Sequence, residues 1–102
     1  MYKLFHVSPA YNDDSIMSSH IDPLRSRGKR KVIWLVDHSQ LMWALSHTSS
    51  RWDVPVSRLS VHEVYVTAPQ ISRTCWTGVF TCGQPIVPEL TQAATEYLSP
   101  VP

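Results

Sequence analysis

The stretch from Lys31 to Val36 constrains the fold more than any other part of this chain. The five residues after the lysine, Val-Ile-Trp-Leu-Val, are all apolar. A strand of this kind is covered on both faces, as the central strand of a sheet is. Asp37 follows as the predicted N-cap of a helix, with Gln40 at capping-box spacing, and apolar residues then recur at helical spacing over 41–48. The sequence therefore predicts a sheet with a helix packed on it.

Shorter elements surround this strand and helix. Eight prolines divide the 102 residues into short segments, and no internal repeat is present. Apolar patterns predict further strands over 2–7, 59–67 and 74–82, the last broken at Gly78, and further helices over 15–19 and 88–98. This order of elements predicts an α+β fold, with residues 1–102 forming a single domain.

The strand predicted over 59–67 has an irregular pattern. Leu59 and Val61 share one parity, whereas Val64 and Val66 take the other. Either a β-bulge in the middle of the strand, near His62, or burial on both of its faces would produce this change of phase.

Composition and charge bear on which classes of protein this chain can belong to. The formal net charge is only +1, although five of the nine basic residues lie between Arg25 and Lys31. No apolar run approaches the roughly 20 residues of a membrane span, and the first residues lack the apolar core of a signal peptide, so we expect a cytoplasmic protein without membrane contact. The spacing of Cys75 and Cys82 matches no common zinc pattern, and no metal site is predicted.

The opening strand carries the main candidate for a functional site. Residues 4–9 read Leu-Phe-His-Val-Ser-Pro, an apolar run that ends on polar residues and is stopped by a proline. An imidazole can act as donor, acceptor or base near neutral pH. His6 is therefore either a half-buried residue with its hydrogen bonds satisfied or a member of a site at this end of the strand.

The order of these segments resembles small domains of the ADP-ribosyltransferase-like superfamily. Such domains open with a strand of the type hydrophobic-His-x-Ser/Thr-Pro, which residues 4–9 match. Residues 20–23, His-Ile-Asp-Pro, are similar to the Gly-Ile/Leu-x-Pro segment that follows, and residues 85–89, Pro-Ile-Val-Pro-Glu, are similar to the closing segment. The resemblance spans nearly the whole chain. It implies a small α+β fold with a split mixed or antiparallel sheet and two to three short helices.

The resemblance also implies a ligand and the residues that hold it. The ligand would be NAD, or a related nucleotide carrying ADP-ribose, in a cleft bounded by the first two strands. In such proteins the first-strand histidine holds the ribose and a second-strand residue contacts the nicotinamide. These roles fall to His6 with Ser8, and to Trp34 or Leu35. The hypothesis requires the rings of His6 and Trp34 to enter one hollow from the same side of the sheet.

The third motif of the superfamily is not matched. Its transferases commonly carry a glutamate at the start of the late strand, whereas residues 73–82 contain no carboxylate. A branch resembling the RNA 2′-phosphotransferases works with histidine and arginines instead, which nominates Arg73, with Gln84 as a second candidate. Lys29 and Arg30, in the basic loop, would meet the pyrophosphate.

The resemblance predicts a transferase, and a non-catalytic binding module is the alternative. His6 and Arg73 would serve in cleaving the N-glycosidic bond of NAD and in transferring ADP-ribose to a macromolecule, either protein or nucleic acid. The alternative is a non-catalytic module that binds a nucleotide or a protein and keeps the fold without the acid. A third reading is a nucleic-acid-binding domain that uses the basic loop. Each candidate also has a structural reading: Trp34 as core, Arg73 as an arginine lying on a neighbouring indole, and the basic loop as solvated surface.

Overall fold

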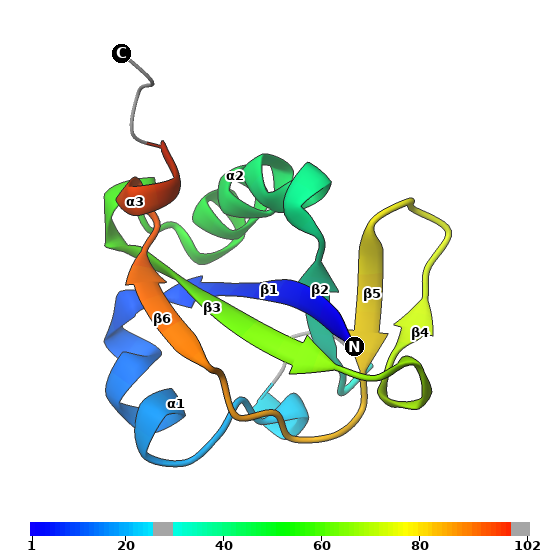
Figure 1. Ribbon diagram of the computed structural model, residues 1–102. Coiled ribbons are helices and arrows are strands. Elements are labelled where there is room, and N and C mark those ends of the chain that lie inside the picture. The colour runs from blue at the N-terminus through cyan, green and yellow to red at the C-terminus, as the bar shows by residue number, and fades with distance from the viewer. Residues whose placement is uncertain (26–29, 99–102) are drawn as a thin grey trace.

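The computed structural model describes residues 1–25 and 30–98. These residues form one antiparallel sheet of six strands with short helices packed on it (Figure 1). The strand order is β4-β5-β2-β1-β3-β6, and every neighbouring pair is antiparallel. The strands are β1 (Tyr2–Pro9), β2 (Ile33–Val36), β3 (Leu59–Val66), β4 (Ser72–Arg73), β5 (Val79–Cys82) and β6 (Leu90–Ala93).

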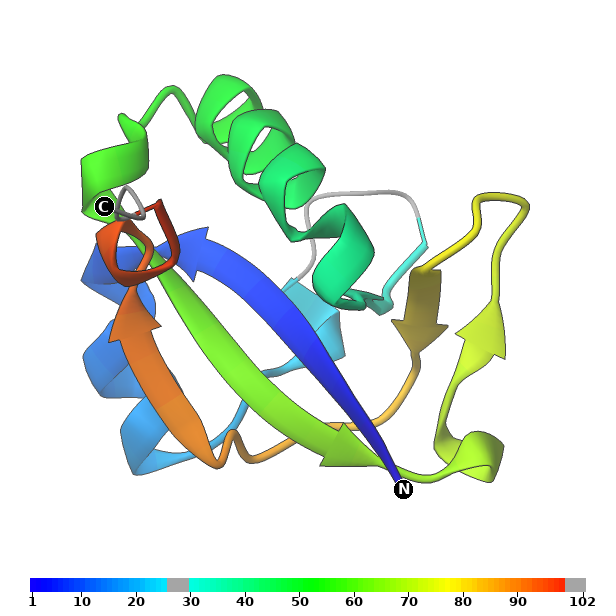
Figure 2. The same cartoon turned by 45° about the horizontal axis from the view of Figure 1, so that its top comes forward.

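Short α-helices cover the two faces of this sheet. They are α1 (Asp13–Ser18), α2 (Leu41–Trp52) and α3 (Thr95–Leu98). Figures 1 and 2 show α2 on one side of β1 and β3 and α1 on the other. The predicted α+β class is therefore confirmed.

Two apolar clusters, one on each face, hold these layers together. Successive side chains of a strand point to opposite faces, so neighbouring residues enter different clusters. The cluster on the α1 face comprises Leu4, Ile16, Ile21, Ile33, Leu35, Val64, Val66, Cys82 and Ile86. The cluster on the α2 face comprises Phe5, Val36, Leu41, Ala44, Leu45, Leu59, Val61, Val79 and Ala94.

Burial on both faces explains the irregular pattern of β3. Its pairing with β1 runs without interruption from Leu59 opposite Pro9 to Val66 opposite Tyr2, so there is no bulge. Seven of its eight residues are buried, and Tyr65 is the exposed one. Of the two explanations that the pattern left open, the second is correct.

The sheet separates between β1 and β2. These strands register at a single pair, Phe5 with Val36, whereas β1 pairs with β3 along its whole length. In Figure 1, β1 runs across the view and β2 runs upward, so the two strands cross rather than run alongside each other. The consequence is an opening between two halves of the sheet, β4-β5-β2 and β1-β3-β6.

The predicted C-terminal helix over 88–98 is wrong in its first half. Leu90–Ala93 forms the edge strand β6, which pairs with β3 from Glu63 to Ser60. Only Thr95–Leu98 is helical. The apolar residues of this segment do show helical spacing, but an unpaired edge of β3 offers main-chain hydrogen bonds that outweigh this local preference.

The predicted start of the central helix is also wrong. Asp37 precedes a 3-10 turn over 38–40, its side chain caps no backbone N–H there, and α2 itself begins at Leu41. The carboxylate of Asp37 instead accepts a hydrogen bond from the hydroxyl of Ser39. At its other end α2 continues beyond the periodic segment, through Trp52, and stops at Asp53 in a left-handed conformation.

A glycine lies against the start of this helix. The predicted strand over 74–82 is wrong in its first half: only Val79–Cys82 is a strand, and residues 74–78 form the turn between β4 and β5. Gly78 has a φ of +80° in this turn. A Cβ atom at this position would lie 2.7 Å from Oδ1 of Asp37. The backbone of the turn therefore packs directly on the segment that leads from β2 into α2.

Candidate functional site

A cavity of about 580 Å³ lies where β1 and β2 separate. Residues of β1, β2, α1 and α2 line it, together with the segment 20–25 and the turn between β4 and β5. Its volume falls within the range of small-molecule and cofactor sites, roughly 300–1,000 Å³. Because the sheet opens here, the cavity has an α1 side and an α2 side.

His6 lies on the α1 side and keeps a neutral imidazole. Its Nδ1 atom is buried and makes no hydrogen bond to any described residue. Burial, and to a lesser extent the ring of His62 at 5.5 Å, lower the pKa of His6 to about 3. A neutral imidazole offers one donor and one acceptor, so His6 suits a hydroxyl or amide of a ligand rather than an anion.

Ser8, also on the α1 side, begins a hydrogen-bond chain. Its Oγ lies 2.8 Å from Nε2 of His62, and Nδ1 of His62 lies 2.8 Å from Oγ1 of Thr91. Thr91 in turn lies 3.0 Å from the sulfur of Met17. The tautomer of His62 sets the direction in which the protons of this chain point. With either tautomer the hydroxyl of Ser8 keeps hydrogen-bonding capacity for a ligand.

A carboxylate lies next to this chain. One oxygen of Asp13 accepts a hydrogen bond of 2.7 Å from Ser60, and the other is buried 3.9 Å from Nε2 of His62, without a hydrogen bond to a described residue. Burial lowers the pKa of His62 and Asp13 opposes that effect, with the lowering larger. His62 is thus neutral at pH 7.

Aromatic side chains dominate the α2 side. All four tryptophans of the chain line the cavity. Trp34, Trp43 and Trp76 remain 41%, 50% and 61% exposed, and we call these three residues the indole wall. Trp43 stacks on His47, one turn further along α2, with ring centres 5.0 Å apart and planes within 13°. Arg51, one more turn along, lines the same cavity.

His6 and Trp34 line the same cavity, but they reach it from opposite faces of the sheet. Because Phe5 registers with Val36, Trp34 shares the face of those two residues, whereas His6 shares the face of Leu4. The expectation that both rings enter from the same side is therefore wrong. The separation of β1 from β2 nevertheless lets one cavity reach both faces.

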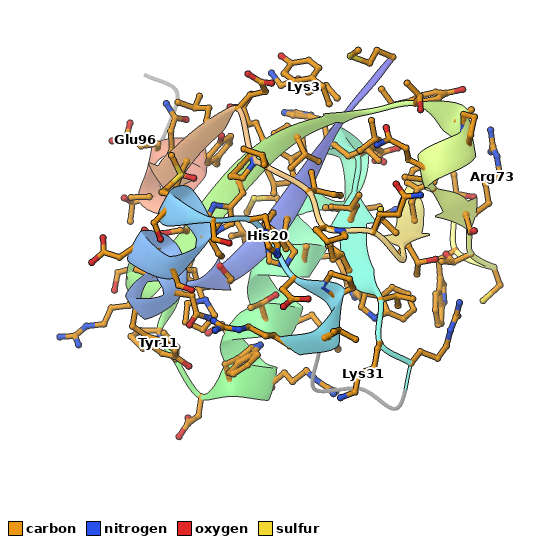
Figure 3. The ribbon with its side chains drawn as sticks, turned by 90° about the horizontal axis from the view of Figure 1, so that it is seen from below. Lys3, Tyr11, His20, Lys31, Arg73 and Glu96 are labelled. Atoms are coloured by element: carbon orange, nitrogen blue, oxygen red, sulfur yellow. The ribbon has the colours of Figure 1, made fainter. Side chains whose placement is uncertain are left out.

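The other predicted site residues are dispersed. Leu35 has no exposed area and belongs to the core on the α1 face. Arg73 is exposed on β4 and does not line the cavity; Figure 3, seen from the α1 side, shows it at the margin of the molecule. Arg30 is exposed outside the cavity lining, and Lys29 lies outside the described residues. Arg25, from the same basic stretch, does line the cavity.

Several lining residues were not predicted as site residues. Trp43, His47 and Arg51 are spaced by four along α2, and this spacing places them on one helical face. That signal was available once the helix was recognised. Trp76 gave no such signal, because it lies in a turn whose position depends on the packing of Gly78 against the rest of the structure.

No carboxylate on the late strand takes the place of the unmatched motif. Among the described lining residues Asp22 alone is acidic, and its Oδ1 accepts the backbone N–H of Leu24 at 2.9 Å. Glu63 lies outside the lining, with Lys3 at 2.9 Å and the hydroxyl of Tyr97 donating at 2.8 Å. Glu63 therefore ties the β1–β3 pair to α3.

The described residues form neither a metal cluster nor a membrane-spanning helix. Within residues 1–25 and 30–98, no three histidine, cysteine, aspartate or glutamate side chains come together in a way that could hold a metal ion. Across the same residues, no helix combines the length and apolar character needed to cross a membrane.

Comparison of the chain with protein-family models, with curated proteins and with solved structures finds no match.

Proposed function

We propose that this protein binds NAD, or a related nucleotide that carries ADP-ribose, in the cavity between β1 and β2. His6 and Trp34 reach the cavity from opposite faces of the sheet, so the proposal no longer rests on both rings entering from one side. The observation that carries it is the lining itself: His6 and Ser8 on the α1 side and exposed indoles on the α2 side of one 580 Å³ space. Neutral His6 and the hydroxyl of Ser8 suit ribose hydroxyl groups, and an indole face suits a nicotinamide or adenine ring.

The arginines of the lining give the nucleotide its third contact. Arg25 lines the cavity, and its Nη1 donates to the hydroxyl of Ser15 at 3.0 Å. Because this partner is neutral, it does not offset the positive charge of the guanidinium. Arg51 lines the cavity from α2 and makes no ion pair with a described residue. A guanidinium binds phosphate oxygens through two parallel N–H groups. The proposal therefore moves the phosphate contact from Lys29 and Arg30 to Arg25 and Arg51.

Transfer of ADP-ribose is the proposed reaction, and binding without turnover is its alternative. Stabilisation of the oxocarbenium-like transition state needs a negative charge near the ribose, and Asp22 is the acid of the described lining. If Asp22 supplies that charge, the protein is a transferase. If it does not, the chain is a nucleotide-binding module that keeps the fold and regulates or recruits a partner.

The test is a titration with NAD that carries a label on its nicotinamide. We expect NAD to raise the melting temperature, and His6→Ala to weaken binding about tenfold, the effect of one lost hydrogen bond inside a cavity. Release of labelled nicotinamide that Asp22→Asn abolishes supports the transferase, whereas binding without release supports the module.

The matched control is His38→Ala. His38 is exposed and lies outside the cavity lining, so its removal should leave NAD binding unchanged. Two results would refute the proposal: no change in melting temperature with NAD, or equal loss of binding in the two histidine variants.

A further inference from the structure

We infer that the indole wall binds unpaired bases of single-stranded nucleic acid in the cavity that the proposed function assigns to NAD. The inference does not depend on the proposed function, because it rests on the indole wall together with Arg51 and Arg25. A strand and NAD would use the same side chains and would therefore exclude each other.

The exposure of the indole wall is the first observation. Trp34, Trp43 and Trp76 are each between 41% and 61% exposed, and they come from β2, from α2 and from the β4–β5 turn. Tryptophan is usually buried for most of its surface, and a cluster of exposed aromatic residues around a hollow marks a binding surface. Because three separate elements converge to present these rings, the wall is built by the tertiary fold.

The stacking of Trp43 on His47 is the second observation. The two rings are 5.0 Å apart and nearly parallel, yet Trp43 is still half exposed. The pair forms a flat platform that is held in place before any ligand arrives. Bases stack on platforms of this kind regardless of sequence, since every base has a π face.

Charge distinguishes nucleic acid from a proline-rich peptide, which also docks on aromatic rings. Arg51 extends the platform by one turn of α2, and Arg25 lies across the cavity on the α1 side. The acid of the lining, Asp22, lies on the α1 side and is held by the N–H of Leu24. A polyanion therefore meets Arg51 next to the indoles and Arg25 across the cavity, a charge that a neutral peptide does not need.

The size of the hollow selects single strands. A space of about 580 Å³ is the size of a small-molecule site and cannot admit a duplex. Bases in a duplex are stacked on their neighbours and are not free to enter it. Loops, strand ends and single strands present unstacked bases that are free to enter the cavity.

Tryptophan fluorescence tests the inference directly, because every tryptophan of the chain lines this cavity. Oligothymidylate and oligouridylate of roughly 12 nucleotides should quench it, and a duplex of the same length should not. Trp43→Ala should weaken binding about tenfold. Tyr65→Ala removes an exposed aromatic side chain outside the lining and should have no effect.

Salt dependence tests the role of the arginine and decides the matter if Trp43→Ala does not fold. Loss of one phosphate contact lowers the slope of log K against log salt by about 0.7 for a single strand. Arg51→Gln should show this change. Arg58→Gln, exposed and outside the lining, should keep the slope of the original protein.

The outcomes separate this inference from the proposed function. NAD binding without oligonucleotide binding overturns the inference alone, and oligonucleotide binding without NAD binding overturns the proposed function alone. Quenching by a duplex as strong as by a single strand, or by a proline-rich peptide as strong as by either oligonucleotide, overturns the inference, as does an unchanged salt slope in Arg51→Gln.

Discussion

His6 makes the stability of this protein depend on pH. The folded chain holds the imidazole neutral with a pKa near 3, because burial and the neighbouring His62 disfavour its charge, whereas the unfolded chain takes up a proton near pH 6.5. Stability should therefore fall as the pH drops from about 6.5 toward 3. Between pH 7.5 and pH 5 the loss from His6 is about 2 kcal/mol, which urea unfolding at the two pH values will measure.

His6→Gln separates this contribution from that of His62. The pKa of His62 is also lowered by burial, so some loss of stability on acidification remains in the variant. We expect the difference in unfolding free energy between pH 7.5 and pH 5 to shrink by about 2 kcal/mol when His6 is replaced. An undiminished difference would mean that the ring takes up a proton inside the folded protein.

Gly78 shows how one turn controls the element that follows. Alanine there would have to adopt a φ of +80°, and its Cβ would lie 2.7 Å from Asp37 and 2.9 Å from Gln40. We expect Gly78→Ala to lower the free energy of unfolding by roughly 2–3 kcal/mol in urea denaturation. Gly83→Ala is the matched control, since its Cβ meets nothing within 4 Å, and it should change stability by less than about 0.5 kcal/mol. Equal losses of unfolding free energy in the two variants would show that the turn shifts enough to accommodate a Cβ atom at position 78 without strain.

The elements that could be predicted from the sequence are those whose pattern is set by burial. The apolar run at 32–36 and the periodic segment from Leu41 became β2 and the body of α2 because most of their apolar residues join the core, although Trp34 of β2 stays 41% exposed. The segment 88–98 failed because an edge of β3 competes with local helical preference, and no local pattern records that edge. The site followed the same division: β1 and β2 supplied His6, Ser8 and Trp34, whereas Trp76 depended on a turn.

The whole molecule consists of two half-sheets that meet at a narrow junction. β1, β3 and β6 pair along most of their lengths, and so do β2 and β5, but the halves register only at Phe5 and Val36. The cavity lies at this junction, and residues of both halves line it, among them His6 and Ser8 from β1 and Trp34 from β2. A ligand that fills it therefore contacts both half-sheets, which pair with each other at a single position.

Hydrogen exchange tests this arrangement. Amides of β1 and β3 should exchange only through global unfolding, whereas amides of β2 and β5 should exchange faster through opening of the weaker half. A ligand bound in the cavity should slow β2 most, because it adds contacts across the junction that β1 and β2 do not make with each other. Equal rates in both halves without ligand would mean that packing of α2 across the junction, through Leu41 and Leu45, already makes the sheet one cooperative unit.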